Sequence, residues 1–258
     1  MIKIGCCGFP VSQELYYKTF NCCEIQITFY TFPNLSLLEK WRKKAPLDFS
    51  FILKASQLIT HPASSPTYKR FQPSSFPLVS FVEKNFGLFR LTKETKTAWE
   101  ETKRQAEVLK TKVILLQTPP SFSEVEENIE NIYSFFSKID RKNLTLVWEP
   151  RGRWQDETLK KISQELNLIL AFDPMRKLPI SGLFQKKGKT PCAFYFRLHG
   201  GKGYRHKFTQ EELNQIAQEA ISRKDGYIMF NNITMFEDAK NMKEIMEEFV
   251  DESRGIKK

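Results

Sequence analysis

Short runs of apolar residues recur along the chain, and segments with helical periodicity separate them. A run that is apolar at nearly every position is typical of a strand buried on both faces. Eight runs of this kind are predicted as strands, near residues 2–6, 22–29, 48–54, 113–117, 144–149, 168–173, 193–199 and 227–231. Strands that alternate with helices indicate a parallel sheet.

The segments between these strands place apolar residues on one side of a helix. Helices are predicted at Leu35–Lys44, Thr92–Thr111, Ser123–Ile139, Asp156–Leu166, Thr209–Arg223 and Phe236–Asp251. Eight parallel strands favour a closed TIM (β/α)8 barrel, because an open doubly wound sheet more often has fewer strands and a glycine-rich first turn. The predicted fold class is therefore α/β, with residues 1–258 as a single domain.

One connection departs from the regular spacing. Residues 61–81, after the third predicted strand, are rich in Ser, Pro and aromatic residues. A long loop at the carboxyl end of a barrel strand is often a lid or a binding loop. We expect that role here.

The composition fits this fold. The chain has 258 residues, of which 41% are hydrophobic and 27% charged, as expected for a globular protein rather than a disordered one. One α/β barrel often uses about 250 residues. The sequence begins with a strand-like Ile2-Lys3-Ile4 and has no run of membrane-spanning length, so a cytoplasmic protein without a membrane partner is expected.

The net charge of +10 favours anionic partners, because a positive field raises their local concentration. The basic residues are spread along the chain, and the only basic end is Lys257-Lys258. No nucleic-acid-binding arm is visible. A lysine-rich, solvated surface is the alternative explanation of the charge.

The five cysteines are Cys6, Cys7, Cys22, Cys23 and Cys192, without C-x-x-C spacing. Zinc ribbons and redox dithiols are therefore unsupported. If the first two strands are parallel neighbours, Cys6 and Cys7 fall near the end of one, and Cys22 and Cys23 near the start of the next. At about 3.3 Å per residue, that separation exceeds disulfide reach, and buried free thiols are expected.

Polar side chains gather where the predicted strands end. In parallel strands these ends meet at one face, which is the usual position of a TIM-barrel active site. The candidate catalytic residues are Glu149, His199, Asp173 and Glu24. The candidate substrate-binding residues are Lys54, Thr60, His61, Gln117, Arg151, Trp154, Arg197, Tyr204, Asn231 and Asn232. Carboxylates and a histidine suit proton transfer, while guanidinium groups suit contacts with anions.

Alternation along the strands predicts which side chains face inward. Glu24, Gln26 and Thr28 share one face of the second strand, and Tyr195, Arg197 and His199 share one face of the seventh. Apolar faces are expected against the outer helices, so the polar faces should point into the barrel. A buried Glu24 needs a cation, and Arg197 or Lys54 are the candidates.

Several of these residues have purely structural alternatives. Glu149 and Arg151 flank Pro150 and could form an ion pair at a strand end. Asp173-Pro174 could start a helix-forming turn, and His199 could be a hydrogen-bonded core histidine. The loop at residues 200–204 is rich in glycine and suits either phosphate binding or a solvent-exposed turn, since it matches no phosphate-loop fingerprint.

A set of motifs follows the order of a known family. They are Gly5 and Gly8, Glu24 to Tyr30, Trp41, Phe49 to Lys54, Ile59-Thr60-His61, Gln117-Thr118-Pro119-Pro120, Trp148-Glu149-Pro150-Arg151 with Trp154, Arg197-Leu198-His199-Gly200, and Phe230-Asn231-Asn232. The chain resembles the YecE-like proteins, the TIM-barrel family catalogued as domain of unknown function 72. The resemblance implies a TIM barrel without an established activity, similar overall to xylose isomerase and apurinic endonuclease barrels. Cys7 departs from the small hydroxyl residue expected there.

The leading hypothesis is an uncharacterised TIM-barrel enzyme, a hydrolase or an isomerase, that binds a phosphate-bearing or sugar-like anion. The alternative is a nucleic-acid binding or processing protein, favoured by the net charge and by aromatic residues near Tyr68 and Phe71. No cofactor is predicted. A trinuclear zinc site needs more imidazoles than the three histidines provide, although one divalent ion held by Glu149, Asp173 and His199 is left open. The sequence does not specify the oligomeric state.

Overall fold

The computed structural model describes residues 1–71, 82–175, 194–223 and 225–253. Its strands are β1 (Ile2–Cys7), β2 (Cys22–Ile25), β3 (Ser50–Lys54), β4 (Val113–Gln117), β5 (Thr145–Glu149), β6 (Ile169–Phe172), β7 (Phe194–Leu198) and β8 (Gly226–Phe230). They follow one another in spatial order and close into a barrel, with β1 parallel to β8. The predicted α/β barrel is therefore confirmed.

The helices lie mostly where the apolar periodicity predicts them. They are α1 (Gln13–Thr19), α2 (Ile27–Tyr30), α3 (Leu35–Lys44), α4 (Gln57–Thr60), α5 (Lys93–Leu109), α6 (Glu126–Lys138), α7 (Asp156–Glu165), α8 (Gln210–Arg223) and α9 (Met235–Ser253). In the described part of the chain, the short 3-10 helices are η1 (Pro66–Arg70), η3 (Glu83–Asn85) and η5 (Gly203–Arg205). No helix among the described residues is long and apolar enough to cross a membrane.

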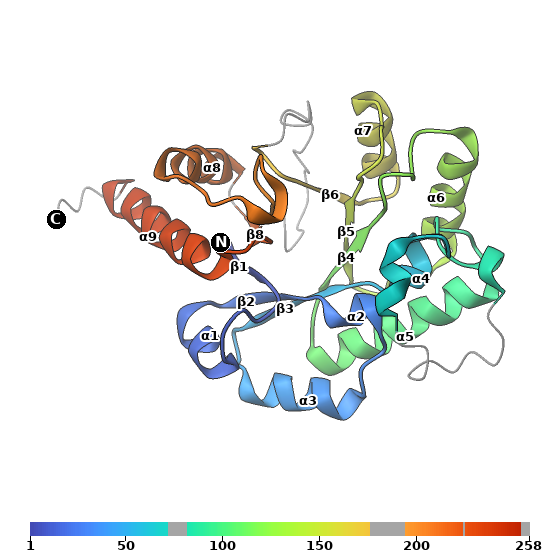
Figure 1. Ribbon diagram of the computed structural model, residues 1–258, viewed down its shortest axis with the longest axis horizontal. Helices are drawn as coiled ribbons and strands as arrows, with labels where there is room; N and C mark the ends of the chain where they lie inside the picture. The colour runs from blue at the N-terminus through green and yellow to red at the C-terminus, as the bar shows by residue number, and fades with distance from the viewer. Residues whose placement is uncertain (72–81, 176–193, 224, 254–258) are drawn as a thin grey trace. The chain divides into compact units, whose positions relative to one another are not determined.

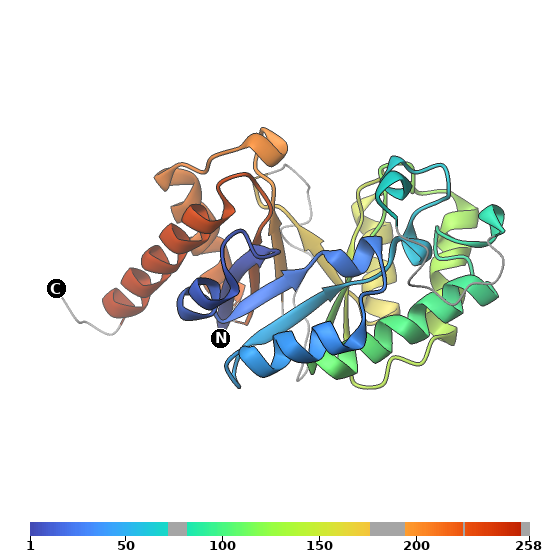
Figure 2. The same ribbon diagram turned by 60° about the horizontal axis from the view of Figure 1, so that its bottom comes forward.

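The chain divides into two compact units. Unit 1 comprises Met1–Glu24, Asp48–Ser50 and Ala171–Lys258, and unit 2 comprises Ile25–Leu47 and Phe51–Leu170. The organisation of residues 1–258 as a single domain stays a prediction. In unit 1, α8 and α9 pack side by side (Figure 1). In unit 2, α3 packs along α5 (Figure 2).

The loop predicted at residues 61–81 is described only in part. Residues 66–70 form η1, and Tyr68 donates a hydrogen bond from its hydroxyl to the His61 carbonyl oxygen at 3.0 Å. Residues 72–81 lie outside the described part of the chain. The role of this loop as a lid stays a prediction.

The second strand is shorter than its apolar pattern predicts. It ends at Ile25, and residues 27–30 form the helical turn α2. Thr28 stabilises that turn, because its hydroxyl lies 3.2 Å from the Ile25 carbonyl oxygen and 2.7 Å from that of Lys54. The predicted alternation of Glu24, Gln26 and Thr28 along one strand face is therefore wrong beyond Ile25.

The predicted separation of the cysteine pairs is also wrong. Cys6 on β1 is the direct register partner of Cys23 on β2, because the two strands are staggered along the barrel. Cys6, Cys7, Cys22 and Cys23 are nevertheless buried free thiols, as predicted. Burial raises the pKa of Cys6 to about 12, so the unreactive thiol form is favoured.

Candidate functional site

In unit 1, a buried ion pair joins β2 to β7. The Arg197 Nε donates to both carboxylate oxygens of Glu24 at 3.1 Å, and its Nη2 lies 3.0 Å from Oε1. The Tyr195 hydroxyl donates to Glu24 Oε2 at 2.5 Å. Glu24 and Arg197 are 0% and 1% exposed, so these contacts replace the water that the charges lose on burial. The prediction that Glu24 pairs with a cation is confirmed, and the cation is Arg197.

Arg197 also orients His199 and Asn231. Its Nη1 lies 3.1 Å from His199 Nε2. Because guanidinium nitrogens only donate, Nε2 must accept, which places the imidazole proton on Nδ1. The orientation of the Asn231 side-chain amide is assigned from its hydrogen-bond partners. In this orientation its oxygen accepts from Arg197 Nη2 at 3.2 Å and from Nη1 at 3.3 Å. The same amide atom lies 3.3 Å from His199 Nδ1 and suits that proton as an acceptor.

Asp173 binds backbone rather than side-chain donors in its described contacts. Its Oδ2 accepts from the amides of His199 at 2.7 Å and Gly200 at 2.8 Å, and its Oδ1 accepts from the Met175 amide at 3.0 Å. The carboxylate therefore fixes both its own turn and the end of β7. The contact with Met175 matches the structural alternative considered for Asp173-Pro174.

Asn232 and Tyr204 occupy different environments in unit 1. Asn232 is fully buried, and its Nδ2 donates to the His206 carbonyl oxygen at 2.7 Å and to Asp238 Oδ2 at 2.5 Å. It therefore holds the loops after β7 and β8 together. Tyr204 is exposed on η5. Whether either residue contacts a substrate is untested.

In unit 2, three adjacent strands present polar side chains on one face. Lys54 on β3 pairs in register with Leu115 on β4, and Gln117, two residues later, pairs with Glu149 on β5. Paired residues in parallel strands share a face, as do residues two apart. Lys54, Gln117 and Glu149 therefore point to the same side, and all three are buried.

The Lys54 ammonium lies against an aromatic ring. Its Nζ is 4.0 Å from the centroid of Phe29, which belongs to α2. The Phe29 ring in turn contacts the His61 imidazole edge to face, with centroids 4.9 Å apart. Lys54 is 5% exposed, so the quadrupole of the ring replaces part of its lost hydration. The short helix α2, which the sequence pattern did not predict, thus positions the partner of Lys54.

His61 is a buried imidazole in a positive environment. Burial, together with the charges of Lys54 and Arg151, lowers its pKa to about 3, while Glu149 acts in the opposite direction. Thr60 Oγ1 lies 2.8 Å from His61 Nδ1, so this hydroxyl fixes the ring orientation. His61 is therefore neutral across the physiological range.

Glu149 and Arg151 form the ion pair that was considered as a structural alternative. Arg151 Nε donates to Glu149 Oε1 at 3.0 Å, and Arg151 is about one-third exposed whereas Glu149 is buried. Because the Arg151 guanidinium is partly exposed, a ligand can still reach it while it pairs with Glu149. A binding role and a structural role are compatible here.

Trp154 contacts Phe122 and Trp148. Its indole nitrogen donates to the Phe122 carbonyl oxygen at 2.8 Å, and its ring packs edge to face on Trp148, with centroids 5.3 Å apart. Trp148 donates from its own indole nitrogen to Thr118 Oγ1 at 3.2 Å. These contacts hold the end of β5 in place, and a contact of Trp154 with substrate is untested.

The structure thus groups the predicted residues by unit. Unit 1 brings together Glu24, Asp173, Arg197, His199 and Asn231, and unit 2 brings together Lys54, Thr60, His61, Gln117, Glu149 and Arg151. Sequence reasoning missed the site contacts of Tyr195 and Phe29, although Tyr195 shares the face of Arg197 at a spacing of two. Among the described residues, no group of three or more His, Cys, Asp or Glu side chains is arranged to hold a metal ion.

Comparison with known proteins identifies the family. The model of a family described as "Protein of unknown function DUF72" matches residues 12–257. This chain belongs to that family. The UPF0759 protein YunF of Bacillus subtilis (strain 168) is 24% identical over 263 residues, which cover 91% of this chain and 85% of YunF. The resemblance drawn from the sequence motifs is confirmed.

Solved structures share the fold. A DUF72 family protein from Enterococcus faecalis V583 is 18% identical, covers 97% of this chain and 98% of its own, and has a TM-score of 0.70. One from Thermotoga maritima MSB8 is 21% identical, with 96% and 99% covered and a TM-score of 0.67. These likenesses are to proteins of the same family and assign no activity.

Enzyme barrels of other families are more distant. An AP endonuclease, family 2, from Brucella melitensis is 12% identical, with 90% of this chain and 92% of that chain covered and a TM-score of 0.56. A xylose isomerase domain containing protein from Salmonella typhimurium LT2 is also 12% identical, with 96% of each chain covered and a TM-score of 0.54. At this identity the likeness concerns the fold alone.

The buried ion pair of unit 1 generates a stability prediction. Replacing Arg197 by Leu should lower the free energy of unfolding by about 3–5 kcal/mol, because it leaves the Glu24 carboxylate buried without its cation. Tyr195→Phe, which removes one neutral donor, should cost about 1–3 kcal/mol. Denaturant unfolding of the purified variants measures both values.

The double variant Glu24→Leu, Arg197→Leu is the matched control. It removes both charges, so it should be more stable than Arg197→Leu alone. If the double variant is the less stable of the two, burial of an uncompensated charge is not what destabilises the single variant.

The environment of His61 generates a pH prediction. Unfolded histidine binds a proton near pH 6.5, whereas folded His61 does so only near its pKa of about 3. As the pH falls below about 6.5, the unfolded state gains this proton first, so folding stability is lost at up to about 1.4 kcal/mol per pH unit. Denaturant unfolding from about pH 7 to about pH 5 should show this slope, and it should be absent from the His61→Gln variant.

Replacing Lys54 by Met tests the assigned cause of the shift. Removing that cation should raise the pKa of His61, which NMR titration of the imidazole measures. An unchanged pKa would mean that burial and Arg151 account for the whole shift.

Proposed function

We propose that this protein is an enzyme that binds an anionic substrate, phosphate-bearing or sugar-like, at the carboxyl ends of the unit 2 strands. The observation that carries this proposal is the depressed pKa of His61, caused by burial together with the charges of Lys54 and Arg151. The part of the shift that Lys54 and Arg151 cause reports a positive field, which favours a negative charge, whereas burial disfavours a charge of either sign. The carboxyl ends of the strands are also where TIM barrels bind their substrates.

The residue types around His61 support both the binding of an anion and an enzymatic reaction. Arg151 offers a planar, partly exposed guanidinium, which suits a phosphate or a carboxylate, while Lys54 adds a buried positive charge. Glu149 supplies a carboxylate for proton transfer, and the neutral imidazole of His61 suits hydrogen bonding to an uncharged group of the substrate. Together these groups support acid–base chemistry on an anion, as in an isomerase or a hydrolase.

Unit 1 supports a different assignment for Arg197. Its guanidinium donates to Glu24, His199 and Asn231. We therefore assign Arg197 as a residue that orients His199, in place of a direct anion contact. His199 stays a candidate residue of unit 1, and Asp173 positions the end of β7 through the backbone amides that it binds.

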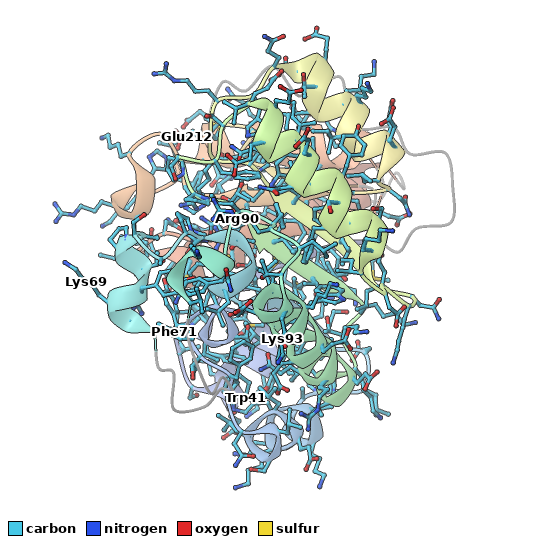
Figure 3. All side chains as sticks on the ribbon, turned by 90° about the vertical axis from the view of Figure 1, so that its right-hand side faces the viewer. Trp41, Lys69, Phe71, Arg90, Lys93 and Glu212 are labelled. Carbon is cyan, nitrogen blue, oxygen red and sulfur yellow. The ribbon has the colours of Figure 1, made fainter. Side chains whose placement is uncertain are left out.

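Nucleic-acid processing is the second candidate function. The net charge of +10 and the likeness of fold to the barrel named as an AP endonuclease favour it. Exposed cations of unit 2 come from separate elements, such as Lys69 on η1 and Lys93 at the start of α5 (Figure 3). Binding of this kind depends steeply on salt, because bound cations displace counterions from the phosphates.

A binding experiment separates the two functions. Isothermal titration with ribose 5-phosphate, glucose 6-phosphate and inorganic phosphate should give saturable binding of at least one compound. Arg151→Gln and Lys54→Met should each weaken that affinity about tenfold or more, which is about 1.4 kcal/mol. Lys69→Met, which removes an exposed lysine of the same unit, is the matched control and should bind normally.

A single-stranded oligonucleotide is the competing ligand. Absence of saturable binding by all three small anions, together with salt-dependent oligonucleotide binding that Lys69→Met weakens, would replace the first function by the second. Equal binding by wild type and Arg151→Gln would remove Arg151 from the site.

A further inference from the structure

We propose that Lys54 is a catalytic nucleophile whose amine condenses with a carbonyl carbon of the substrate to form an imine. The substrate class is then an anionic aldehyde or ketone, such as a sugar phosphate in its open-chain form or a 2-oxo acid. This inference rests on the proposed function, because it names the compound that the anion site of unit 2 takes.

The position of Lys54 distinguishes it from the other lysines discussed. Lys69 and Lys93 are exposed, whereas Lys54 is 5% exposed at the end of a barrel strand. A buried ammonium loses hydration, and a second cation, Arg151, contributes to the same local field. Both effects ease the loss of a proton that gives the nucleophilic amine, while the Phe29 ring and the Glu149 carboxylate on the same face stabilise the resting ammonium that attracts the anion.

The Phe29 ring suits the product of the condensation as well as the lysine itself. The protonated imine carries its positive charge on the same nitrogen as the ammonium, so the face of Phe29 remains opposite a cation after the reaction. The ring also excludes water from one side of Nζ, which slows hydrolysis of the imine. Its contact with His61 fixes the ring, since Phe29 and His61 are both buried.

The groups required for proton transfer lie on the face of the sheet that carries Lys54. Glu149 and Gln117 share that face by register, and His61 contacts the ring that Lys54 covers. The Glu149 carboxylate suits the role of proton acceptor, while Gln117 and neutral His61 suit hydrogen bonding to the carbonyl oxygen. The geometry thus pairs a buried amine with a base and with neutral donors.

These groups and water supply and accept all the protons that the condensation requires. Lys54 first gives one ammonium proton to a base, Glu149 or water, and the Nζ lone pair then attacks the carbonyl carbon. The carbonyl π electrons move to oxygen, which takes a proton, while the nitrogen, now cationic, gives up a proton to Glu149 or water; the product is a neutral carbinolamine. The nitrogen lone pair then forms the C=N bond, and the hydroxyl group leaves as water after a second proton transfer. No oxidant, reductant or cofactor is consumed.

Borohydride trapping tests the proposal. Wild-type protein is incubated with ribose 5-phosphate, glyceraldehyde 3-phosphate or pyruvate, with and without sodium borohydride, and its peptides are mapped by mass spectrometry. Hydride reduces the imine to a stable secondary amine, so the Lys54 peptide should gain the mass of the carbonyl compound less one oxygen atom. The adduct should require borohydride, and inorganic phosphate should compete with its formation.

Two variants keep the result interpretable. Lys54→Arg keeps the positive charge, so its affinity for the phosphorylated compound should lie within about threefold of the wild-type affinity. It should form no adduct on the peptide that contains position 54. Lys69→Met should still be trapped at Lys54. Trapping spread over exposed lysines, with none at Lys54, would overturn the inference.

The outcomes separate this inference from the proposed function. Saturable binding of the phosphorylated compounds without a Lys54 adduct would support the anion site and contradict the formation of an imine at Lys54. Absence of both binding and adduct would overturn the two together. An adduct at Lys54 that forms equally well with uncharged aldehydes would support the nucleophile and contradict the anionic substrate class.

Discussion

The register of parallel strands is the constraint on which the placement of the candidate residues on the strands depends. Directly paired residues in such strands share a face, and the strand direction is common to all. Cys7 and Glu24 are paired in unit 1, as are Gln117 and Glu149 in unit 2. Side chains far apart in the sequence therefore point to the same side without any local sequence signal. A shift of one residue would turn each of them to the opposite face.

The two clusters satisfy their charges in different ways. In unit 1, the Glu24 carboxylate accepts from Arg197 and Tyr195, and the same guanidinium reaches His199 and Asn231. Such a network is rigid, because moving one side chain would leave its buried partners without a hydrogen bond. In unit 2, the positive charge is strong enough to help depress the pKa of a histidine. The first arrangement favours a fixed scaffold, and the second favours an incoming anion.

Much of the fold is predictable from the sequence, because buried strands and amphipathic helices have distinct periodicities. The strand Val113–Gln117 and the helix Leu35–Lys44 are located correctly to the residue. The end of β2 is not, because Ile27 and Phe29 suit an apolar strand as well as a helical turn, and the hydrogen bond from Thr28 to the Lys54 carbonyl oxygen is a long-range contact. Local pattern carries no information about such a contact.

The composition of the candidate site is predictable to a smaller extent. Polar residues at strand ends identify Glu24, His61 and Arg197, but their types do not reveal how their hydrogen bonds are shared. Arg197 has the chemistry of an anion ligand, and only its contacts with Glu24 and His199 show that it serves other side chains. Likewise, the cysteine register depends on the stagger between β1 and β2, which is a property of the closed barrel as a whole.

Burial against an aromatic ring at a strand end distinguishes Lys54 from the exposed lysines of this protein and from the buried Lys103, which pairs with Glu100 and Asp140. Exposed lysines raise the local concentration of any anion, and salt screens them, so they select little. A lysine at 5% exposure costs solvation energy in the folded state, and the Phe29 ring replaces part of the hydration that its ammonium loses. Desolvation is also how proteins make a lysine amine nucleophilic. The same environment that makes Lys54 costly for stability is therefore the environment that its proposed chemistry requires.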